Sequence, residues 1–408
     1  KLQTVFSSVF AKPLGYYSAD NSYFKQKYVD FMANYNSAIG EDFNLTGTLG
    51  TSYEEYDTKS QGFGGHLSLI PNKFIFSNTN SLQSGGSEGS SRKSNFAVFA
   101  SAELAWRSAL FLTLTGRTDK PSQLVNSVDP WIFYPSIGLS AVVTDLIGSD
   151  LRAKLRPALS YLKVRTSFTE VGSPIPFTGL TPGTITHSMG SGKVEPFDYY
   201  PLPDLKAERT RSVELGIDSR WFDGALTFGA TIYQSNTLNQ LLETDLDPGT
   251  GYKKLYVQAG NVRNRGVEMT LGFHKKFGEF DYNSSLTATA NRNKIIKLAS
   301  GVTNPISGQV FDLTDIRKGR FRLREGGELG DVYASERIKR DANGYVEYTQ
   351  GQSLVTEPTE PYKLGSVNAK WNFGWKHGFS YKGFDLNVLF TARLGGIVIS
   401  KTQAALDK

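Results

Sequence analysis

Strict alternation between apolar and polar residues, held over unusually long stretches, constrains this chain more than any other feature. Residues 212–237 read SVELGIDSRWFDGALTFGATIYQSNT, with a turn around Phe222-Asp223-Gly224. Successive side chains of a strand point to opposite faces, so this segment predicts an antiparallel hairpin with about ten residues in each strand. Strands of globular proteins usually have about five or six residues, so the length requires an explanation.

The two faces of this hairpin differ sharply in polarity. The apolar face carries Val213, Leu215, Ile217, Leu226, Phe228, Ala230 and Ile232. The polar face includes Glu214, Asp218, Thr227 and Tyr233. One face is therefore suited to an apolar surrounding and the other to water.

The same pattern recurs along the chain. Hairpins are expected in 29–56, 94–120, 266–293 and 366–396, with tight turns near residues 40, 107, 277 and 382. Residues 134–143 and 161–171 form a further pair, and the segment between them can hold a helical turn. The count is about 12 strands, or 14 if both ends of the chain contribute.

The connections between strands alternate in length. Tight turns close each hairpin, whereas long loops join successive hairpins at about 57–93, 117–133, 172–210, 236–264 and 294–360. This alternation is typical of outer-membrane barrels, which have short periplasmic turns and long extracellular loops. We therefore predict an all-β fold, an antiparallel transmembrane β-barrel whose apolar face meets lipid and whose polar face lines a lumen. No apolar run exceeds about five residues, so no membrane-spanning helix is expected.

Aromatic residues cluster where the expected strands end. They are Tyr53, Tyr56, Trp131, Phe133, Tyr134, Trp221, Phe222, Tyr381 and Phe384. Tyr and Trp favour the interface between membrane and water, although such residues also cover the rim of a soluble core. Together with strand length and loop alternation, they favour the barrel.

Motifs for catalysis or for a cofactor are not found in the sequence. The chain has no cysteine, and MGSGKVE (189–195) departs from a phosphate-binding loop at two required positions. His66, His187, His274 and His377 lack the spacing of metal ligands. The net charge of +6 is spread thinly, which disfavours nucleic-acid binding. We expect no catalytic residue, no metal site and no cofactor.

Substrate specificity is expected in the long loops, because loops on a rigid scaffold commonly carry binding residues. Loop 172–210 holds four aromatic residues among Pro, Gly and polar residues: Phe177, Phe197, Tyr199 and Tyr200. These are candidate contacts for a sugar or a peptide. The alternative is that they fix the loop onto its own barrel.

Several segments closely resemble the barrel of SusC/RagA-like TonB-dependent transporters. They are FYPSIGLSAVV (133–143), YLKVRTSFTEVGS (161–173), PLPDLKAERTRSVELGIDSRWFDGALTFGATIYQSNTLNQLL (201–242), YVQAGNVRNRGVEMTLGF (256–273) and LGSVNAKWNFGWKHGFSYKGFDLNVLF (364–390). The resemblance covers about residues 94 to 396, and residues 1–93 fit as earlier barrel strands. It implies structural roles for the matched motifs, with Asn261, Gly266 and Glu268 ordering the start of a strand.

The resemblance implies TonB-dependent uptake of a glycan or an oligopeptide across the outer membrane of a Bacteroidetes-type bacterium. It also implies a barrel of about 22 strands closed by an N-terminal plug. Residues 1–408 would then be a partial barrel, with the plug and the final strands outside this chain. The implied partners are a SusD-like surface lipoprotein, often in a dimer of such pairs, and the TonB-ExbB-ExbD complex.

Two other functions fit parts of the pattern. A soluble β-rich glycan-binding protein would have shorter strands and apolar residues on facing sheets. A passive porin would need a complete barrel without a plug. Neither alternative accounts for the family-specific segments as well as an importer does.

Overall fold

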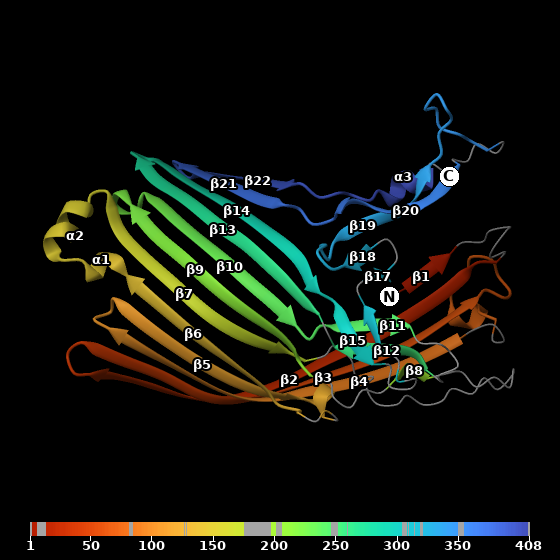
Figure 1. Cartoon of the computed structure of the whole chain (residues 1–408), viewed down its shortest axis with the longest axis horizontal. Helices are drawn as coiled ribbons and strands as arrows, with labels where there is room; N and C mark the ends of the chain where they lie inside the picture. Colours follow the sequence, from red (N-terminus) through yellow and green to blue (C-terminus); the bar gives the residue numbers. More distant parts are fainter. Residues whose placement is uncertain are drawn as a thin grey trace.

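A 13-stranded antiparallel sheet dominates the molecule (Figure 1). The computed structural model describes residues 2–5, 14–80, 85–125, 127, 129–174, 197–200, 206–245, 252–258, 260–303, 308, 310–313, 315–318, 321–349 and 355–406. Strands neighbouring in the sheet follow chain order, except that strands belonging to the long loops are passed over. The sheet is therefore a meander of hairpins, as the alternating connections predicted.

Twelve long strands and one short strand form this sheet. The short strand is β1 (Leu2–Val5), and the long strands are β2 (Tyr16–Ile39), β3 (Phe43–His66), β4 (Gly85–Trp106), β5 (Leu110–Pro121), β6 (Ile132–Val142), β7 (Leu159–Ser173), β9 (Glu208–Trp221), β10 (Leu226–Leu238), β13 (Asn261–Phe277), β14 (Phe280–Lys297), β21 (Trp371–Tyr381) and β22 (Phe384–Leu394). The prediction of about 12 strands is confirmed. The sheet is part of a barrel wall, and its edge strands are β1 and β22.

The tight turns gather at one end of the sheet, on the left of Figure 1. The β9–β10 turn has positive φ at Phe222, Asp223 and Gly224, which lets the chain reverse within three residues. Between β6 and β7 lie α1 (Val143–Leu146) and α2 (Ser149–Leu155), which confirms the expected helical segment. None of the helices in the described residues is long and apolar enough to span a membrane.

The apolar face of the sheet is open rather than covered by a second layer. Leu114, Ile137, Phe168 and Val213 stand side by side in register across β5, β6, β7 and β9. Their side chains are between 38% and 55% exposed. An apolar surface this extensive marks contact with another apolar phase, because soluble monomers rarely leave one open to water.

Aromatic side chains gather on the apolar face near the tight turns of β13, β14 and β21. Tyr282 and Phe379 stack with ring centroids 5.1 Å apart, and Trp375 lies 4.4 Å from His377. At the far end of the same face, the Phe96 and Trp131 rings meet edge to face. Aromatic girdles at both borders of an apolar band are typical of outer-membrane barrels.

Two expectations about the strand ends were wrong. β3 continues to His66 and β4 begins at Gly85, so much of the expected loop 57–93 is strand. Tyr53 and Tyr56 consequently lie in the middle of β3. The extended parts of these strands are polar on both faces, so apolar alternation could not reveal them.

The long loops also contain more regular structure than expected. β8 (Phe197–Tyr200), β11 (Leu241–Asp245) and β12 (Tyr252–Gln258) form one small sheet. β15 (Ala299–Thr303) pairs with β16 (Val310–Leu313). A four-stranded sheet contains β17 (Asp315–Lys318), β18 (Phe321–Arg324), β19 (Asp331–Ile338) and β20 (Thr356–Ser366), and α3 (Lys401–Leu406) follows the last long strands.

The loop sheets pack against the polar side of the wall at the end opposite the tight turns. Val262, Ile295 and Leu298 are buried there and contact Ile316 and Leu323 of the four-stranded sheet. A second small core joins Leu124, Ile132 and Ala207, with Tyr134 and Leu241 against it. These two small cores fix the loop sheets at the end of the wall opposite the tight turns.

The residues expected to order the start of a strand are only partly confirmed. Asn261 begins β13 and accepts a 2.8 Å hydrogen bond from Asn236 Nδ2. Gly266 and Glu268 instead lie in the interior of β13. Gly266 leaves room for the ring of Tyr233, since a Cβ there would lie 2.4 Å from the ring.

Candidate functional site

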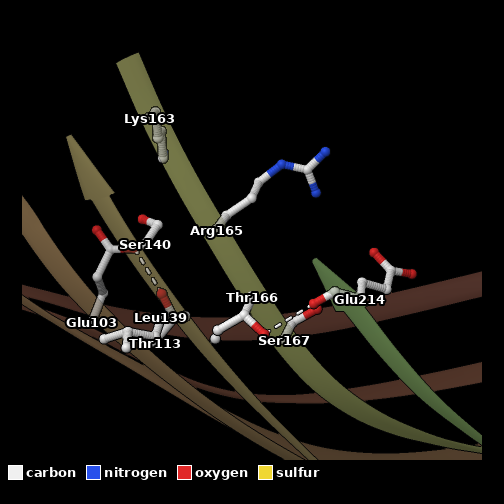
Figure 2. Close-up of a pocket in the computed structure, with 10 residues that line it drawn as sticks. Glu103, Thr113, Leu139, Ser140, Lys163, Arg165, Thr166, Ser167 and Glu214 are labelled. Carbon is white, nitrogen blue, oxygen red and sulfur yellow. Dashed lines mark hydrogen bonds between the residues drawn. The ribbon is translucent and has the colours of Figure 1, made fainter. Parts of the chain in front are cut away.

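The candidate site lies on the polar face, midway along the strands. Cross-strand register aligns Glu103, Thr113, Gly138, Ser167 and Glu214 in one row across β4, β5, β6, β7 and β9. A depression of about 260 Å³ opens over this row, and Figure 2 shows Lys163 and Arg165 of β7 projecting beside it. The row is possible because every member occupies the polar position of its strand.

Arg165 is held across two neighbouring strands. Its Nε lies 3.3 Å from Asp218 Oδ2, and its Nη2 donates a 2.6 Å hydrogen bond to Thr231 Oγ1. The guanidinium passes directly over Gly216, where a Cβ would lie 2.6 Å from Arg165 Cζ. A guanidinium carries five N–H donors, and these contacts use only part of them. Arg165 can therefore bind a carboxylate or carbonyl while it remains fixed in place.

The other side of the depression is acidic. Thr113 Oγ1 donates a 3.0 Å hydrogen bond to Glu103 Oε2, and both residues line the depression. Glu214 lies beyond Ser167 on the opposite side. Cations of β7 are thus flanked by carboxylates on β4 and β9. Such a mixed-charge, hydrated surface can bind polar solutes through either sign of charge.

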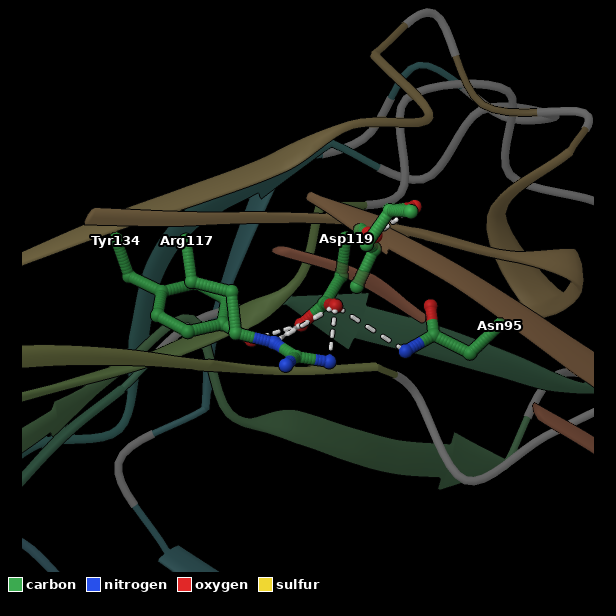
Figure 3. Close-up of polar contacts among 6 residues, drawn as sticks. Asn95, Arg117, Asp119 and Tyr134 are labelled. Atoms are coloured by element: carbon green, nitrogen blue, oxygen red, sulfur yellow. Dashed lines mark hydrogen bonds and ion pairs between the residues drawn. The ribbon is translucent and has the colours of Figure 1, made fainter. Parts of the chain in front are cut away.

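A second polar cluster, drawn in Figure 3, lies nearer the loop end. Asp119 is only 8% exposed and accepts hydrogen bonds from Asn95 Nδ2 at 3.2 Å and from Arg117 Nε at 3.0 Å. Tyr134 also donates to Asp119 and accepts a 3.0 Å bond from Arg117. The guanidinium of Arg117 lies 5.5 Å from the ring centre of Phe99. This cluster ties β4, β5 and β6 together beneath the loops.

The polar residues predicted to face the lumen are found together on one face. Glu214 lies opposite Tyr233, and Thr227 lies opposite Arg220. Asp218 forms the ion pair with Arg165. The prediction from the alternation in residues 212–237 is therefore confirmed.

The four aromatic candidates for substrate contact are only partly visible. Phe177 lies outside the described residues. Phe197, Tyr199 and Tyr200 form β8, which pairs in parallel with β12 at the edge of the small loop sheet. Their role stays a prediction.

Three of the four histidines have structural partners. His377 Nδ1 lies 2.8 Å from the Tyr282 hydroxyl, His274 Nε2 lies 2.9 Å from Asp281, and the His66 ring meets Tyr16 edge to face. His187 lies outside the described residues. Within the described part of the chain, no three His, Cys, Asp or Glu side chains converge as metal ligands would.

Comparison with known proteins places this wall in a family. The family described as "TonB dependent receptor-like, beta-barrel" matches residues 2–396. "TonB-dependent receptor P3" of Formosa agariphila is 22% identical over an alignment that covers 91% of this chain and 39% of that protein. The chain therefore spans about two fifths of the length of this relative.

Solved structures show the same fold at low sequence identity. The structure described as "Structure of the RagAB peptide transporter" has a TM-score of 0.75 and 18% identity, covering 95% of this chain and 43% of that one. The outer membrane transporter YddB from Escherichia coli has a TM-score of 0.52 and 12% identity, covering 98% and 47%. The chain belongs to the TonB-dependent receptor-like β-barrel family, as the resemblance of its strands to SusC/RagA-like transporters predicted.

Proposed function

We propose that this chain is part of the barrel wall of an outer-membrane importer that takes up oligopeptides or glycans with TonB-supplied energy. The observation that carries the proposal is the division of the sheet into an exposed apolar face and a polar face lined with fixed charges. An apolar exterior suits lipid, and a polar interior suits a hydrated passage. Membership of the barrel family and the likeness to RagAB support this role.

The arrangement of charge on the polar face favours an oligopeptide over a neutral glycan. An extended peptide carries a carboxylate, an ammonium and a row of amide groups. Arg165 offers donors to the first of these, while Glu103 and Glu214 offer acceptors to the second. RagAB, which has a similar fold, is described as a peptide transporter.

Phe197, Tyr199 and Tyr200 are proposed as substrate contacts at the loop end. β8 lies in one of the loop sheets and not in the membrane-facing wall. An entering solute would reach the loop sheets first. Aromatic faces pack on sugars and on peptide side chains alike. Phe177 belongs to the same proposal by its place in the loop.

The rest of the importer is proposed to come from outside this chain. An open sheet edge in lipid would leave backbone N–H and C=O groups unpaired, so β22 and β1 need partner strands. We propose that further strands of the whole protein pair with β22 and β1. A plug, also outside this chain, would close the barrel, and a TonB-ExbB-ExbD complex would displace it. A SusD-like lipoprotein covering the loop end, in a dimer of such pairs, completes the proposal.

Uptake in cells tests this function. Cells with and without the whole gene would receive a fluorescent tripeptide mixture or a fluorescent oligosaccharide, before and after a protonophore collapses the proton gradient. The proposal expects uptake that needs both the gene and the gradient. Uptake that survives the protonophore would instead establish the passive porin, and recovery of the protein without detergent would establish the soluble binding protein.

A further inference from the structure

A patch of unpaired basic residues lies on the apolar side of β13 and β14, just beyond the apolar band. It consists of Arg263, Arg265, Arg292 and Lys294, here called the basic patch. Register sets Arg265 opposite Arg292 and Arg263 opposite Lys294. Arg265, Arg292 and Lys294 are exposed, and Arg263 is half-buried.

No carboxylate neutralises the basic patch within the described residues. Arg265 Nε donates to Gln234 Oε1 at 2.6 Å, a neutral partner. Glu170, on the same face of β7, forms ion pairs with Arg209 and Arg211 of β9, and the Glu325 carboxylate beside β14 accepts a hydrogen bond from Leu298 N. Like charges directly opposite one another destabilise a sheet. An anion from outside the chain would relieve the repulsion within these two successive pairs.

The β2–β3–β4 region, at the same height, shows a different charge arrangement. Arg265 and Arg292 lie twelve residues from the tight turn of their hairpin, as do Lys27 and Glu55 of β2 and β3, which form a 2.6 Å ion pair. Fourteen residues from their turns, the pair Arg263–Lys294 corresponds to Asp57–Arg92, another ion pair. At these two heights, Lys27 and Arg92 each have an acid that the corresponding basic residues on β13–β14 lack.

The height of the basic patch matches the surface of a membrane. Twelve residues at about 3.3 Å each, in a strand tilted by about 40°, rise roughly 30 Å above the turns. The hydrocarbon core of a bilayer is also about 30 Å thick. The patch thus lies at the headgroups of the leaflet on the loop side, above the apolar residues Val267 and Leu271 of the same strand face.

We propose that the basic patch binds the phosphate of an outer-leaflet lipid, whose acyl chains lie along the apolar face below it. Arginine suits this role because its planar fork forms paired hydrogen bonds with phosphate oxygens. Lys294 adds a compact charge beside the fork. The inference rests on the proposed placement of the wall in a membrane, but its test does not depend on transport.

The test measures lipid binding to the whole protein, extracted from outer membranes in detergent, by native mass spectrometry. Phosphatidic acid and diacylglycerol with identical acyl chains serve as probes, since they differ only in the phosphate. We expect phosphatidic acid to bind about tenfold tighter than diacylglycerol. The R263Q/R265Q/R292Q/K294Q variant should lose that preference, whereas K27Q/R92Q, at the same height, should keep it.

Two further measurements test whether the charge of the basic patch drives lipid binding, and they do so even if the glutamine variant does not fold. The R263K/R265K/R292K variant keeps the charge and should retain most of the binding, and added NaCl should weaken binding to the unaltered protein. Equal binding of both lipids, or no loss in a folded glutamine variant, would overturn the proposal. Complete displacement by millimolar inorganic phosphate would point to a free-anion site instead.

Discussion

The two faces of the long strands differ sharply in polarity: one exposes apolar side chains, and the other carries ion pairs. On the apolar face, Leu215 is 48% exposed and Ile232 is 55% exposed, although a water-soluble sheet would bury both. On the polar face, Asp218 and Arg165 form an ion pair, and the Arg165 guanidinium lies over Gly216, one residue from Leu215. The comparison teaches that the solvent on each side, rather than a shared core, dictates the sequence of such a wall.

The largest effect on stability is expected when a charge is placed on the apolar face of a strand, and a charge on the polar face of the same strand provides the comparison. Leu114 and Thr115 are neighbours on β5, exposed on the apolar and polar face respectively. Leu114→Arg should destabilise the protein in a bilayer by about 2–4 kcal/mol, because the charge would enter hydrocarbon. The measurement is reversible urea unfolding in liposomes. Thr115→Arg is the matched control and should change stability by less than about 1 kcal/mol; equal losses would refute the assignment of faces.

Removing the carboxylate of the buried cluster should have the next largest effect. Asp119→Ala leaves Arg117, Tyr134 and Asn95 without their shared acceptor, which should lower the free energy of unfolding by about 1–3 kcal/mol. The same unfolding assay measures it. Asp218→Ala, at the exposed ion pair with Arg165, should lower it by less than about 1 kcal/mol. A larger loss at Asp218 would show that the polar face is drier than we infer.

Filling the space beneath Arg165 should have a smaller effect on stability and should test whether the position of Arg165 matters for binding. Gly216→Ala places a Cβ 2.6 Å from the guanidinium carbon and should displace Arg165 from Asp218 and Thr231. Because the displaced atoms are the end of a flexible side chain, the expected loss of stability is about 1 kcal/mol. Gly47→Ala on β3 is the control, since its Cβ would meet only Ser101 O at 3.7 Å and Gly47 does not line the depression. Binding of a probe tripeptide should weaken in the first variant alone.

The smallest effect is expected at the tight turns, where Arg107 Nε lies 2.9 Å from Asp42 Oδ1. The hydrogen bond from Arg107 lowers the pKa of Asp42 from 3.8. A lowered pKa in the folded state means that this contribution is present above about pH 3.8 and is lost as the pH falls further. Melting temperatures of the unaltered protein and of Asp42→Asn should therefore converge below that pH. A difference that stays constant down to pH 2 would contradict the assignment.

The strands that cross the apolar band could be predicted from the sequence because each repeats an apolar residue at every second position. The β9–β10 turn at Phe222, Asp223 and Gly224 was predictable for a similar reason, since Asp and Gly tolerate positive φ. The polar ends of β3 and β4 were not predictable. Their residues beyond Tyr56 and before Phe96 mostly alternate one polar residue with another, so the period of two is invisible.

The candidate site could be predicted only in part, because it depends on register between strands. Glu214 and Asp218 were assigned to the polar face from their own strand. The partner of Asp218 is Arg165, 53 residues earlier, and Asp119 on β5 has partners on β4 and β6 besides Arg117 of its own strand. Register between distant strands follows from turn and loop geometry, which local patterns do not encode. The short loop strands such as β8 were missed because they are too short for periodicity to detect.

The most direct test of the two-faced wall is a scan of β9 with spin labels. Single cysteines at positions 213–218 can be labelled one at a time once any cysteine elsewhere in the whole protein is replaced, since this chain has none of its own. In the whole protein in a bilayer, we predict that labels at 213, 215 and 217 collide with oxygen dissolved in lipid. Labels at 214, 216 and 218 should collide with a water-soluble nickel chelate. Labels at 213, 215 and 217 that are shielded from both reagents would show that the apolar face is a protein core and does not face lipid.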